Sequence, residues 1–542
     1  MKMKMLLAGF LMFVSITLGA KPPANLQERL EQWNQGQPGG VAVAWVDADG
    51  TAFFQTGQFD AGDPRPITPD TQFELGSVTK VFTALLLAES ERAGKVRRDD
   101  SAAKHLLPAD DPAQAGLRKI TLLSLTTHTS GLPQIPANFG AGASSGDPYA
   151  AYGREELLQA LRSDGVAASG NAPATYSNFG VALLGQALAS AWGTSYADAL
   201  RAHVLAPLGL EATVVPAGGQ EASENLAPPH VGAKRVPAWT FEACAPAGAL
   251  RSSARDMARF VEACLGRRPV LQEALQASFV PQRNYPDFKG SRIALGWIVS
   301  GGPEQPILWH NGLTRGSHAF VGISAQTGAG VVILANTQKG PEALGFGLLG
   351  SAMPQAPSNA VDNASDYPGR YPLNAAFALT ITAADGLLFC QGTGQPRVAL
   401  RPVGKDRFSI VGVPAEISFE RDASGQVVAL TLHQNGRDQR AARGALPAAP
   451  KPVTLPAATL AQYPGSYPLL PDFVLIVTIE NGGVFVQATG QAKFPVYASA
   501  PDEFYYTVVE ARISFTRDAA GKVDGLVLHQ NGQDMPAKRR SP

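Results

Sequence analysis

The chain of 542 residues is long enough for two to four domains with ample hydrophobic core. Its 45 lysines and arginines equal its 45 aspartates and glutamates, so no basic field exists to attract nucleic acid or an anionic membrane surface. The sequence has no Cys/His cluster with zinc spacing and no paired carboxylate motif, so we expect no metal, no other cofactor and no glycosidase chemistry.

The N-terminus has the pattern of a signal peptide. Met1–Lys4 is basic, Met5–Leu18 is apolar, and Gly19-Ala20 offers small residues for cleavage. This apolar run is too short to span a membrane stably, and no later run approaches membrane length. We therefore expect residues 1–20 to be removed from a periplasmic or secreted protein that is not an integral membrane protein. A retained membrane anchor is the alternative.

A helix and a hairpin follow. Leu26–Trp33 has helical periodicity. Val41–Val46 and Thr51–Phe54 flank the Asp/Gly turn Asp47–Gly50, and this pattern predicts a β-hairpin.

The next apolar run contains no glycine or proline and predicts a helix that begins near Ser77 and ends by Gly94. Ser77 would lie on the first turn, where unpaired backbone N–H groups and the helix dipole favour an oxyanion. Lys80 lies one turn later on the same face. A lysine that burial keeps neutral can accept the proton of a serine, so Ser77-x-x-Lys80 predicts an activated nucleophile.

The Ser-x-x-Lys motif is weak by itself, because a chain of this length holds about one or two by chance. A second copy runs from Ser101 to Lys104 and follows Asp99-Asp100 in a charged segment. We interpret this second copy as a solvated helix cap.

A short helix is predicted over Ile120–Leu132, with its end at Gly131. His128 in this segment is interpreted as a structural histidine, because no nucleophile pairs with it in the sequence. A loop of small residues, Gly140–Gly146, and a helix over Arg154–Arg162 follow.

Tyr176 and Asn178 lie in a loop marked by Pro173, directly before a Leu/Ala-rich helix over Val181–Trp192. Side chains in such a loop can face a cleft. This is the only Tyr-x-Asn in the chain. A packing tyrosine and a helix N-cap asparagine are the alternative interpretations.

Helical patterns continue over Leu205–Leu210 and Ala254–Leu265, and then the pattern changes to strands. The four predicted strands are Ile293–Val299, Ile307–Trp309, Ala319–Ile323 and Val331–Ala335.

His310-x-Gly312 and Leu313 follow the second of these strands directly. We expect these residues on an edge strand, where Gly312 would let a ligand approach the backbone. His230-x-Gly232 has the same spacing but follows two prolines without a strand pattern, so we discount it.

Together these elements predict an α+β domain over residues 21–350. Early and late strands would share one antiparallel sheet, flanked by helices and accompanied by a helical subdomain.

Cys244 and Cys264 can form a disulfide only if the fold brings them together, and we expect buried free thiols there and at Cys390.

The tail is a tandem duplication after a linker over residues 351–366. Tyr367–Tyr371 recurs as Tyr463–Tyr467, and Leu432–Gly436 recurs as Leu528–Gly532, each pair 96 residues apart.

Short alternating runs broken by Asp/Asn-Gly predict a small antiparallel barrel or sandwich in each copy, and we expect a β-barrel. The barrels would cover residues 367–446 and 463–542, with a second linker over residues 447–462. His433 and His529 belong to a repeated His-Gln-Asn-Gly turn, which we interpret as structural rather than as a site.

Ser77-x-x-Lys80, Tyr176-x-Asn178 and His310-x-Gly312 occur in that order on a helix start, a loop and a strand end. In this combination the chain resembles the penicillin-binding and class C β-lactamase-like serine hydrolases, whose third element is Lys-Thr-Gly or, in several subgroups, His-x-Gly. The resemblance covers roughly residues 25–345. The tail resembles the tandem β-barrels of D-aminopeptidases.

The resemblance implies that Ser77 attacks an acyl carbon while Lys80 and Tyr176 relay the proton to the leaving group. Backbone N–H groups of Ser77 and Leu313 would hold the oxyanion. Asn178 would orient Lys80 or bind a substrate amide.

His310 departs from the lysine of the Lys-Thr-Gly motif. A histidine is only partly protonated near neutral pH, so it is expected to hold a substrate carboxylate less firmly than a lysine.

The resemblance implies an exported serine hydrolase that cleaves amide bonds of β-lactams or of short peptides containing D-residues. A carboxylesterase of the same family is one alternative. A non-catalytic penicillin-binding or cell-wall-binding protein is another, and peptidoglycan would then be a partner besides a small-molecule or peptide substrate.

Overall fold

The computed structural model describes residues 21–540 apart from short gaps. The gaps are residues 137, 140–146, 169, 217–222, 302–304, 355–360, 362, 375–376, 385, 394–396, 411–414, 435–436, 445–451, 471–472, 481, 490–492, 507–510 and 531–532. The predicted signal peptide, the Gly140–Gly146 loop and the Asn-Gly ends of the two repeated turns therefore lie outside the described residues. The chain divides into two compact units after Pro357.

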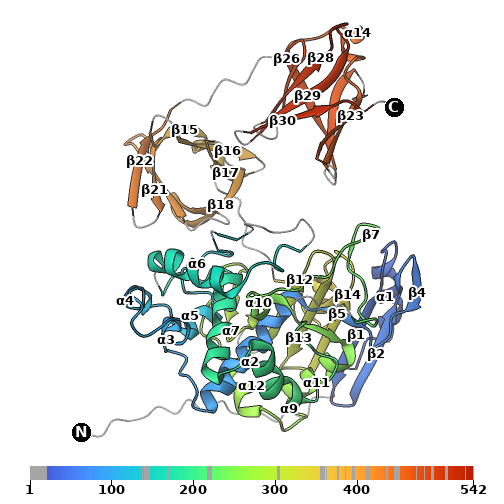
Figure 1. The fold of residues 1–542 in the computed structure, drawn as a ribbon, viewed down its shortest axis with the longest axis vertical. Coiled ribbons are helices and arrows are strands. Elements are labelled where there is room, and N and C mark those ends of the chain that lie inside the picture. Colours follow the sequence, from blue (N-terminus) through green and yellow to red (C-terminus); the bar gives the residue numbers. More distant parts are fainter. Residues whose placement is uncertain are drawn as a thin grey trace. The chain divides into compact units, whose positions relative to one another are not determined.

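One antiparallel sheet of eight strands organises the first unit (Figure 1), in the order β2-β1-β14-β13-β12-β11-β10-β9. Its strands are β1 (Val41–Asp47), β2 (Gly50–Thr56), β9 (Arg283–Asn284), β10 (Arg292–Ile293), β11 (Ile298–Ser300), β12 (Ile307–Leu313), β13 (His318–Ser324) and β14 (Ala329–Ala335). Val41 pairs with Ala335, so the prediction that early and late strands share a sheet is confirmed.

The sheet has a hydrophobic core on each face. Successive side chains of a strand point to opposite faces, so the fully buried β1 contributes to both cores. Ala42, Ala44 and Val46 belong to one core, and Val41, Val43 and Trp45 belong to the other.

The helices divide between these two cores. Residues of α2 (Thr79–Arg92), α7 (Asn178–Trp192) and α11 (Ala254–Cys264) belong to the larger core, and residues of α1 (Leu26–Asn34) and α13 (Glu342–Leu348) belong to the other. The helical subdomain and its connections contain α3 (Ala102–Leu106), α4 (Gln114–Leu117), α5 (Leu122–Thr126), α6 (Arg154–Ala167), α8 (Tyr196–Leu200), a π-helix (Arg201–Leu205), α9 (Ala206–Leu208), α10 (Ala245–Gly248) and α12 (Gln272–Ser278). The predicted α+β fold class is confirmed.

Two predicted elements are shorter than expected. The helix predicted over Ile120–Leu132 ends at Thr126, because the chain turns at His128, whose φ of +59° is incompatible with a continuing helix. The strand predicted over Ile293–Val299 is divided between β10 and β11 by a turn at Gly296.

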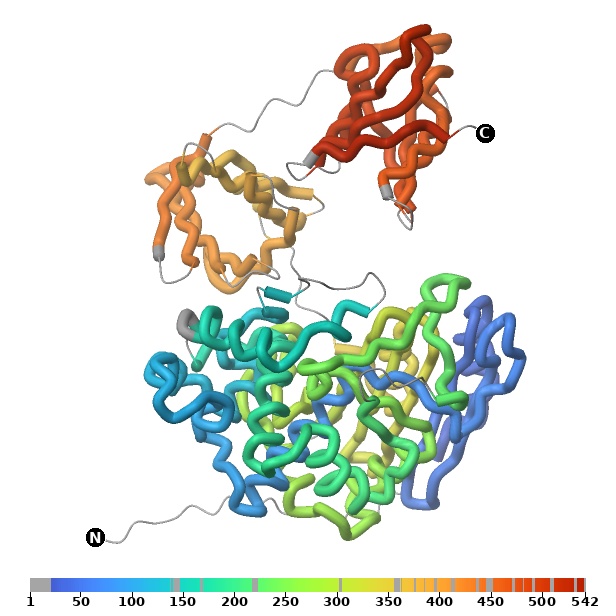
Figure 2. Tube along the Cα trace, viewed as in Figure 1, coloured from blue at the N-terminus to red at the C-terminus, as the bar shows by residue number. Residues whose placement is uncertain are grey.

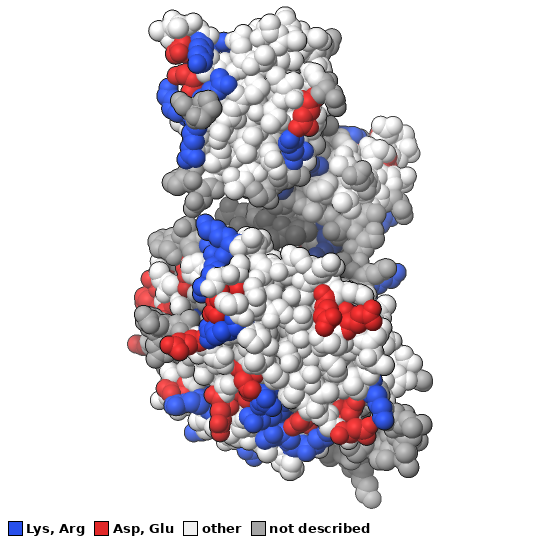
Figure 3. Space-filling model, turned by 90° about the vertical axis from the view of Figure 1, so that its right-hand side faces the viewer, with Lys and Arg blue, Asp and Glu red and all other residues white. Residues whose placement is uncertain are grey.

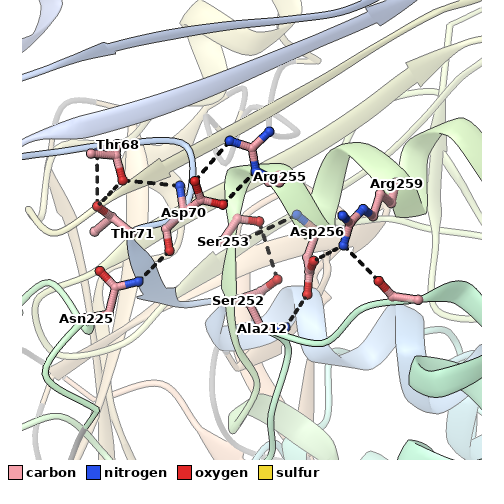
Figure 4. A network of polar contacts seen from close by, with 11 residues as sticks. Thr68, Asp70, Thr71, Ala212, Asn225, Ser252, Ser253, Arg255, Asp256 and Arg259 are labelled. Atoms are coloured by element: carbon pink, nitrogen blue, oxygen red, sulfur yellow. Dashed lines mark hydrogen bonds and ion pairs between the residues drawn. The ribbon is translucent and has the colours of Figure 1, made fainter.

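A polar network braces the strand that leads into Ser77 (Figure 4). This strand, β5 (Gln72–Glu74), pairs with β8 (Arg251–Ser253). Ser253 caps α11 by accepting a hydrogen bond from the Asp256 backbone N–H, and the Asp256 carboxylate accepts one from the Ala212 N–H at 2.8 Å. Arg255 donates to Asp70 just before β5 at 2.6 Å.

The second unit contains two eight-stranded antiparallel barrels (Figure 2), as predicted. The first comprises β15 (Gly369–Pro372), β16 (Ala378–Ala384), β17 (Leu387–Gly392), β18 (Arg397–Gly404), β19 (Arg407–Ile410), β20 (Ala415–Arg421), β21 (Val427–Gln434) and β22 (Arg437–Ala442). The second comprises β23 (Gly465–Leu470), β24 (Phe473–Glu480), β25 (Gly483–Ala488), β26 (Lys493–Ala500), β27 (Glu503–Tyr506), β28 (Ala511–Arg517), β29 (Val523–Gln530) and β30 (Gln533–Lys538).

Each barrel is closed by one antiparallel bridge between its ends, at Arg370–Gly444 and at Ser466–Arg540. The repeated tyrosines also have equivalent contacts, because the Tyr371 hydroxyl donates to the Tyr367 carbonyl, as Tyr467 does to Tyr463, both at 2.7 Å. The duplication in the sequence is therefore a duplication of the fold.

Acidic and basic side chains intermingle on the face shown in Figure 3, so this face has no large patch of a single sign. None of the helices in the described ranges has the length and apolar character that crossing a membrane requires.

Cys244, Cys264 and Cys390 are free and buried, as expected, so the first two do not form a disulfide.

Candidate active site

Ser77 lies in a tight turn next to the central sheet. A 3₁₀ turn over Gly76–Val78 precedes α2, so the α-helix predicted to begin near Ser77 begins at Thr79. Gly76 has a φ of +50°, and a Cβ there would lie 2.7 Å from the Leu313 backbone N. Only glycine allows β12 to approach this turn so closely.

Lys80 contacts the Ser77 hydroxyl from the first turn of α2. Its Nζ lies 3.0 Å from Ser77 Oγ and donates to the Ala247 carbonyl at 2.6 Å. The Lys80 side chain is only 2% exposed. Burial lowers the pKa of Lys80 well below its usual range, because an ammonium group loses its hydration there. The amine can therefore be neutral and accept a proton.

Tyr176 contacts the same hydroxyl from the loop before α7. Its phenol donates to Ser77 Oγ at 2.5 Å, and its ring centroid lies 4.8 Å from Lys80 Nζ. Burial raises the pKa of Tyr176, so the group remains a phenol that can donate a proton. An amine and a phenol from different elements thus share one serine oxygen.

Asn178 is the first residue of α7 and not its cap. The N-cap is Ser177, whose hydroxyl accepts from the Gly180 N–H at 2.9 Å, so the N-cap interpretation of Asn178 is wrong. The Asn178 side chain instead interacts with the hydroxyl of Tyr149 and lowers the pKa of that phenol, against the larger rise that burial causes.

His310, Gly312 and Leu313 all belong to β12, which pairs with β13 over its whole length. The prediction of an edge strand is wrong, because β12 lies inside the sheet. Its neighbour β11, however, pairs only with residues 307–309, so residues 310–313 have no paired strand on that side among the described residues.

His310 is buried, and its Nδ1 lies 2.6 Å from the Asn311 carbonyl. Burial, helped by nearby Lys80, lowers the pKa of His310 to about 3. The imidazole is therefore neutral at pH 7 and not partly protonated as expected. The expectation differed because loss of hydration on burial cannot be read from the sequence.

The backbone of β12 lies against the Ser77 turn. A Cβ at Gly312 would lie 2.9 Å from the Ser77 backbone N, and Gly76 is in similar proximity to the Leu313 N. The turn that carries the Ser77 amide and the strand that carries the Leu313 amide are therefore in close contact, and these two amides are the donors predicted for an oxyanion site. The Leu313 side chain itself is 52% exposed.

His128 contacts the site without having been predicted to belong to it. Its ring lies 4.8 Å from the Tyr176 ring, and its Nδ1 accepts from the Ser177 N–H at 3.2 Å. Burial lowers the pKa of His128, and proximity to Lys80 and His310 lowers it further. No local pattern indicated this contact, because the two segments meet only in the fold.

The duplicate motifs are separate from this arrangement. Ser101 donates to the Leu117 carbonyl at 3.2 Å, and Lys104 pairs with Asp100 at 3.0 Å. His230 Nδ1 lies 3.0 Å from the Asn336 carbonyl. These partners are not the residues around Ser77, in agreement with the prediction that neither motif belongs to the site.

The repeated histidines of the barrels have partners on neighbouring strands. His433 lies between Ser418 and Asp438, both at 2.8 Å, and His529 has the equivalent serine and aspartate partners. Within the described ranges, no group of three His, Cys, Asp or Glu side chains is arranged to hold a metal ion.

Comparison with known proteins gives two family matches. Residues 24–347 match the family described as Beta-lactamase. Residues 353–443 and 449–539 each match a domain of unknown function, DUF3471.

Two relatives and one solved structure illustrate the similarity. Penicillin-binding protein 4* of Bacillus subtilis is 24% identical over 447 residues, which cover 74% of this chain and 94% of the relative. A beta-lactamase of Escherichia coli is 28% identical over 276 residues, 50% of this chain and 69% of the relative. The crystal structure of a class C beta lactamase from Rhodobacter sphaeroides has a TM-score of 0.50 and 25% identity, and covers 58% of this chain and 95% of that structure.

These matches agree with the eight-stranded sheet, its flanking helices and the barrels of the tail. The match to the first family extends over more than half of the chain. This protein therefore belongs to the beta-lactamase family of serine acyl hydrolases.

Proposed function

We propose that the protein is an exported hydrolase that forms an acyl-enzyme on Ser77 and cleaves amide bonds of β-lactams or of short peptides containing D-residues. The observation that carries this proposal is the pair of contacts to Ser77 Oγ, from the Lys80 amine at 3.0 Å and from the Tyr176 phenol at 2.5 Å. These three groups form a continuous path for one proton.

Acylation begins when Ser77 Oγ attacks the substrate carbonyl carbon and the neutral Lys80 accepts its proton. The carbonyl π bond opens, and the resulting oxyanion lies between the backbone N–H groups of Ser77 and Leu313. When the C–N bond breaks, Tyr176 donates a proton to the leaving nitrogen and recovers one from Lys80.

Deacylation follows the same path in the opposite direction. Water attacks the acyl carbon and gives a proton to Tyr176, which passes its own proton to the neutral Lys80. The C–O bond to Ser77 then breaks, and Lys80 returns a proton to Oγ. Asn178 is proposed to orient the substrate beside this path, and His310 and Gly312 to line its opposite side.

Amide substrates are supported by the names of the relatives, which include β-lactamases and a penicillin-binding protein. A carboxylesterase is a second candidate, and the neutral His310 favours it. Without a cation at this position, a substrate carboxylate gains little binding free energy, whereas the binding of an uncharged ester does not depend on a cation.

Export is supported by the basic and apolar N-terminal segments, Met1–Lys4 and Met5–Leu18. N-terminal sequencing of the protein from the periplasm and culture medium of an expressing bacterium tests it. A chain that begins after residue 20 is expected there, and a full-length chain held in the membrane fraction would contradict export.

A substrate panel tests the proposed reaction. It contains a chromogenic cephalosporin, D-alanyl peptides and short-chain p-nitrophenyl esters, each assayed with wild type, Ser77→Ala and the matched control Ser101→Ala. We expect Ser77→Ala to abolish every turnover and Ser101→Ala to change none. Turnover retained in Ser77→Ala would refute the proposed nucleophile.

Intact-mass measurement separates a hydrolase from a non-catalytic penicillin trap. After exposure to a fluorescent penicillin, we expect an adduct on wild type that disappears as it hydrolyses, and none on Ser77→Ala. A permanent adduct would instead favour a binding protein. Sedimentation of Ser77→Ala with purified peptidoglycan tests the cell-wall-binding alternative.

A further inference from the structure

Five aromatic side chains from two distant segments meet beside the candidate active site. Tyr149 is at their centre, with ring centroids 4.5 Å from Phe241, 5.2 Å from Trp239 and 4.9 Å from Phe139. Tyr152 lies 5.2 Å from Phe139. We call Tyr149, Trp239 and Phe241 the aromatic wall.

Hydrogen bonds hold the two segments together. Both the backbone N–H and the hydroxyl of Thr240 donate to the Asp147 carboxylate at 2.8 Å. The Ala243 N–H donates to the Tyr152 carbonyl at 3.1 Å. The aromatic wall is therefore fixed in place before a ligand arrives, which lowers the entropic cost of binding.

Three contacts connect the aromatic wall to the residues around Ser77. Asn178 interacts with the Tyr149 hydroxyl closely enough to lower the pKa of that phenol. The Phe241 ring lies against Gly248, where a Cβ would be 2.9 Å from it, and Gly248 follows the Ala247 whose carbonyl accepts from Lys80. The backbone N–H of Trp239 donates to the carboxylate of Glu74, three residues before Ser77, at 2.7 Å.

Tyr149 and Trp239 are partly exposed, whereas Phe241 is buried behind them. Partly exposed rings beside the residues around Ser77 provide a flat apolar surface, and aromatic rings prefer offset or edge-on contact with other rings.

We propose that the aromatic wall is a subsite for an aromatic ring of the substrate, which lies next to Asn178 while Ser77 attacks the carbonyl. The inference rests on the proposed function and narrows its substrate class to acyl compounds with an aromatic substituent. Trp239 and Tyr149 determine this specificity.

Two pairs of substrates measure the preference for an aromatic ring. p-Nitrophenyl phenylacetate and p-nitrophenyl acetate differ on the acyl side, and the benzyl and methyl thioesters of N-acetyl-D-alanine differ on the leaving side. The readout is the ratio of kcat/KM within each pair, because the ratio does not depend on the fraction of folded enzyme.

We expect wild type to prefer the aromatic member of at least one pair by about tenfold. Trp239→Ala is expected to reduce this ratio to about twofold or less, and Tyr149→Leu to reduce it as well. Trp192→Ala is the matched control, since Trp192 stacks on His203 at the other end of α7 and should leave the ratio unchanged.

A wild-type ratio near one in both pairs, or a ratio that both aromatic-wall variants leave unchanged, overturns the proposal. Failure of the proposed function would give a different result, because Ser77→Ala would then retain turnover whatever the ratio of kcat/KM. Thermal melting of each variant shows whether it is folded, and Trp239→Phe, which keeps a ring, should retain most of the wild-type ratio.

Discussion

The first unit and the barrels both contain a serine with a proton acceptor, but the two clusters are built differently. Ser77 has a lysine and a tyrosine as partners, whereas Ser418 in the first barrel contacts His433, whose other nitrogen contacts Asp438. The second barrel repeats this serine–histidine–aspartate arrangement. By connectivity alone, the barrel clusters resemble a nucleophile, base and acid more closely than the cluster around Ser77 does.

Burial separates the two clusters. Lys80 is 2% exposed, and its loss of hydration is what makes it a base. The side chain of Asp438 is 71% exposed and that of His433 is 28% exposed, so water screens their interaction. The comparison teaches that the identity of neighbouring groups does not create an activated serine unless the protein also removes water from them.

The largest expected effect comes from introducing a permanent positive charge at position 80. Lys80→Arg introduces a guanidinium that cannot lose its proton, so acylation of Ser77 should fall by roughly 10³-fold. The measurement is the rate at which a fluorescent penicillin or p-nitrophenyl ester acylates the protein. Lys104→Arg is the matched control and should retain the wild-type rate.

Tyr176→Phe removes the proton donor while keeping the ring. We expect turnover to fall by roughly 10²-fold, because the leaving group and the incoming water both need this path. Single-turnover kinetics measure acylation and deacylation separately. Normal rates for both steps would show that Tyr176 only packs against Lys80.

The pH dependence of acylation tests the burial argument directly. Lys80 is a base whose pKa is lowered in the folded protein, so it is neutral above that lowered pKa and protonated below it. Acylation should therefore decrease as pH falls through this value, well below the usual lysine pKa of 10.5. The same shift means that the unfolded chain binds this proton more readily, so the stability contribution of Lys80 also decreases as pH falls from 10.5 toward the lowered pKa. An acylation rate that begins to decrease near pH 10.5 would contradict a buried neutral amine.

His310→Lys tests the missing cation. A lysine here would attract a substrate carboxylate, so we expect preference for a carboxylate substrate over its methyl ester to rise by about tenfold. The ratio of kcat/KM for the two substrates is the measurement. Asn311→Lys, one residue along the same strand, is a control for added charge.

The smallest effect is expected in the barrels. The double variant Ser418→Ala, Ser514→Ala should leave turnover unchanged and cost at most about 1 kcal/mol of unfolding free energy per site, as for an ordinary hydrogen bond. Denaturant unfolding and the substrate panel measure the two quantities. Labelling of either serine by a fluorophosphonate would contradict the burial argument.

Much of the fold could be predicted because its signals are local. The apolar run over Val41–Val46 and the Asp/Gly turn after it predict a hairpin from neighbouring residues alone. The 96-residue repeat predicts that the tail folds twice in the same way, and both barrels have the same strand order. The three candidate site motifs could also be located, since each has a recognisable spacing on a recognisable element.

Contacts between distant segments had no such signal. The 3₁₀ turn at Ser77 depends on the close approach of β12, and the position of β12 inside the sheet depends on pairing with β13. The contact of His128 with Tyr176 and the meeting of Tyr149 with Phe241 join segments that no periodicity connects.

The available chemical groups and their order could be read from the chain, because side-chain chemistry and local periodicity are properties of neighbouring residues. Their protonation depends on the folded unit, because burial sets the pKa of Lys80 and of His310 and burial is a property of the whole unit. The fold also joins a hydroxyl and a phenol 99 residues apart in one hydrogen bond, since no local interaction can bring such positions together.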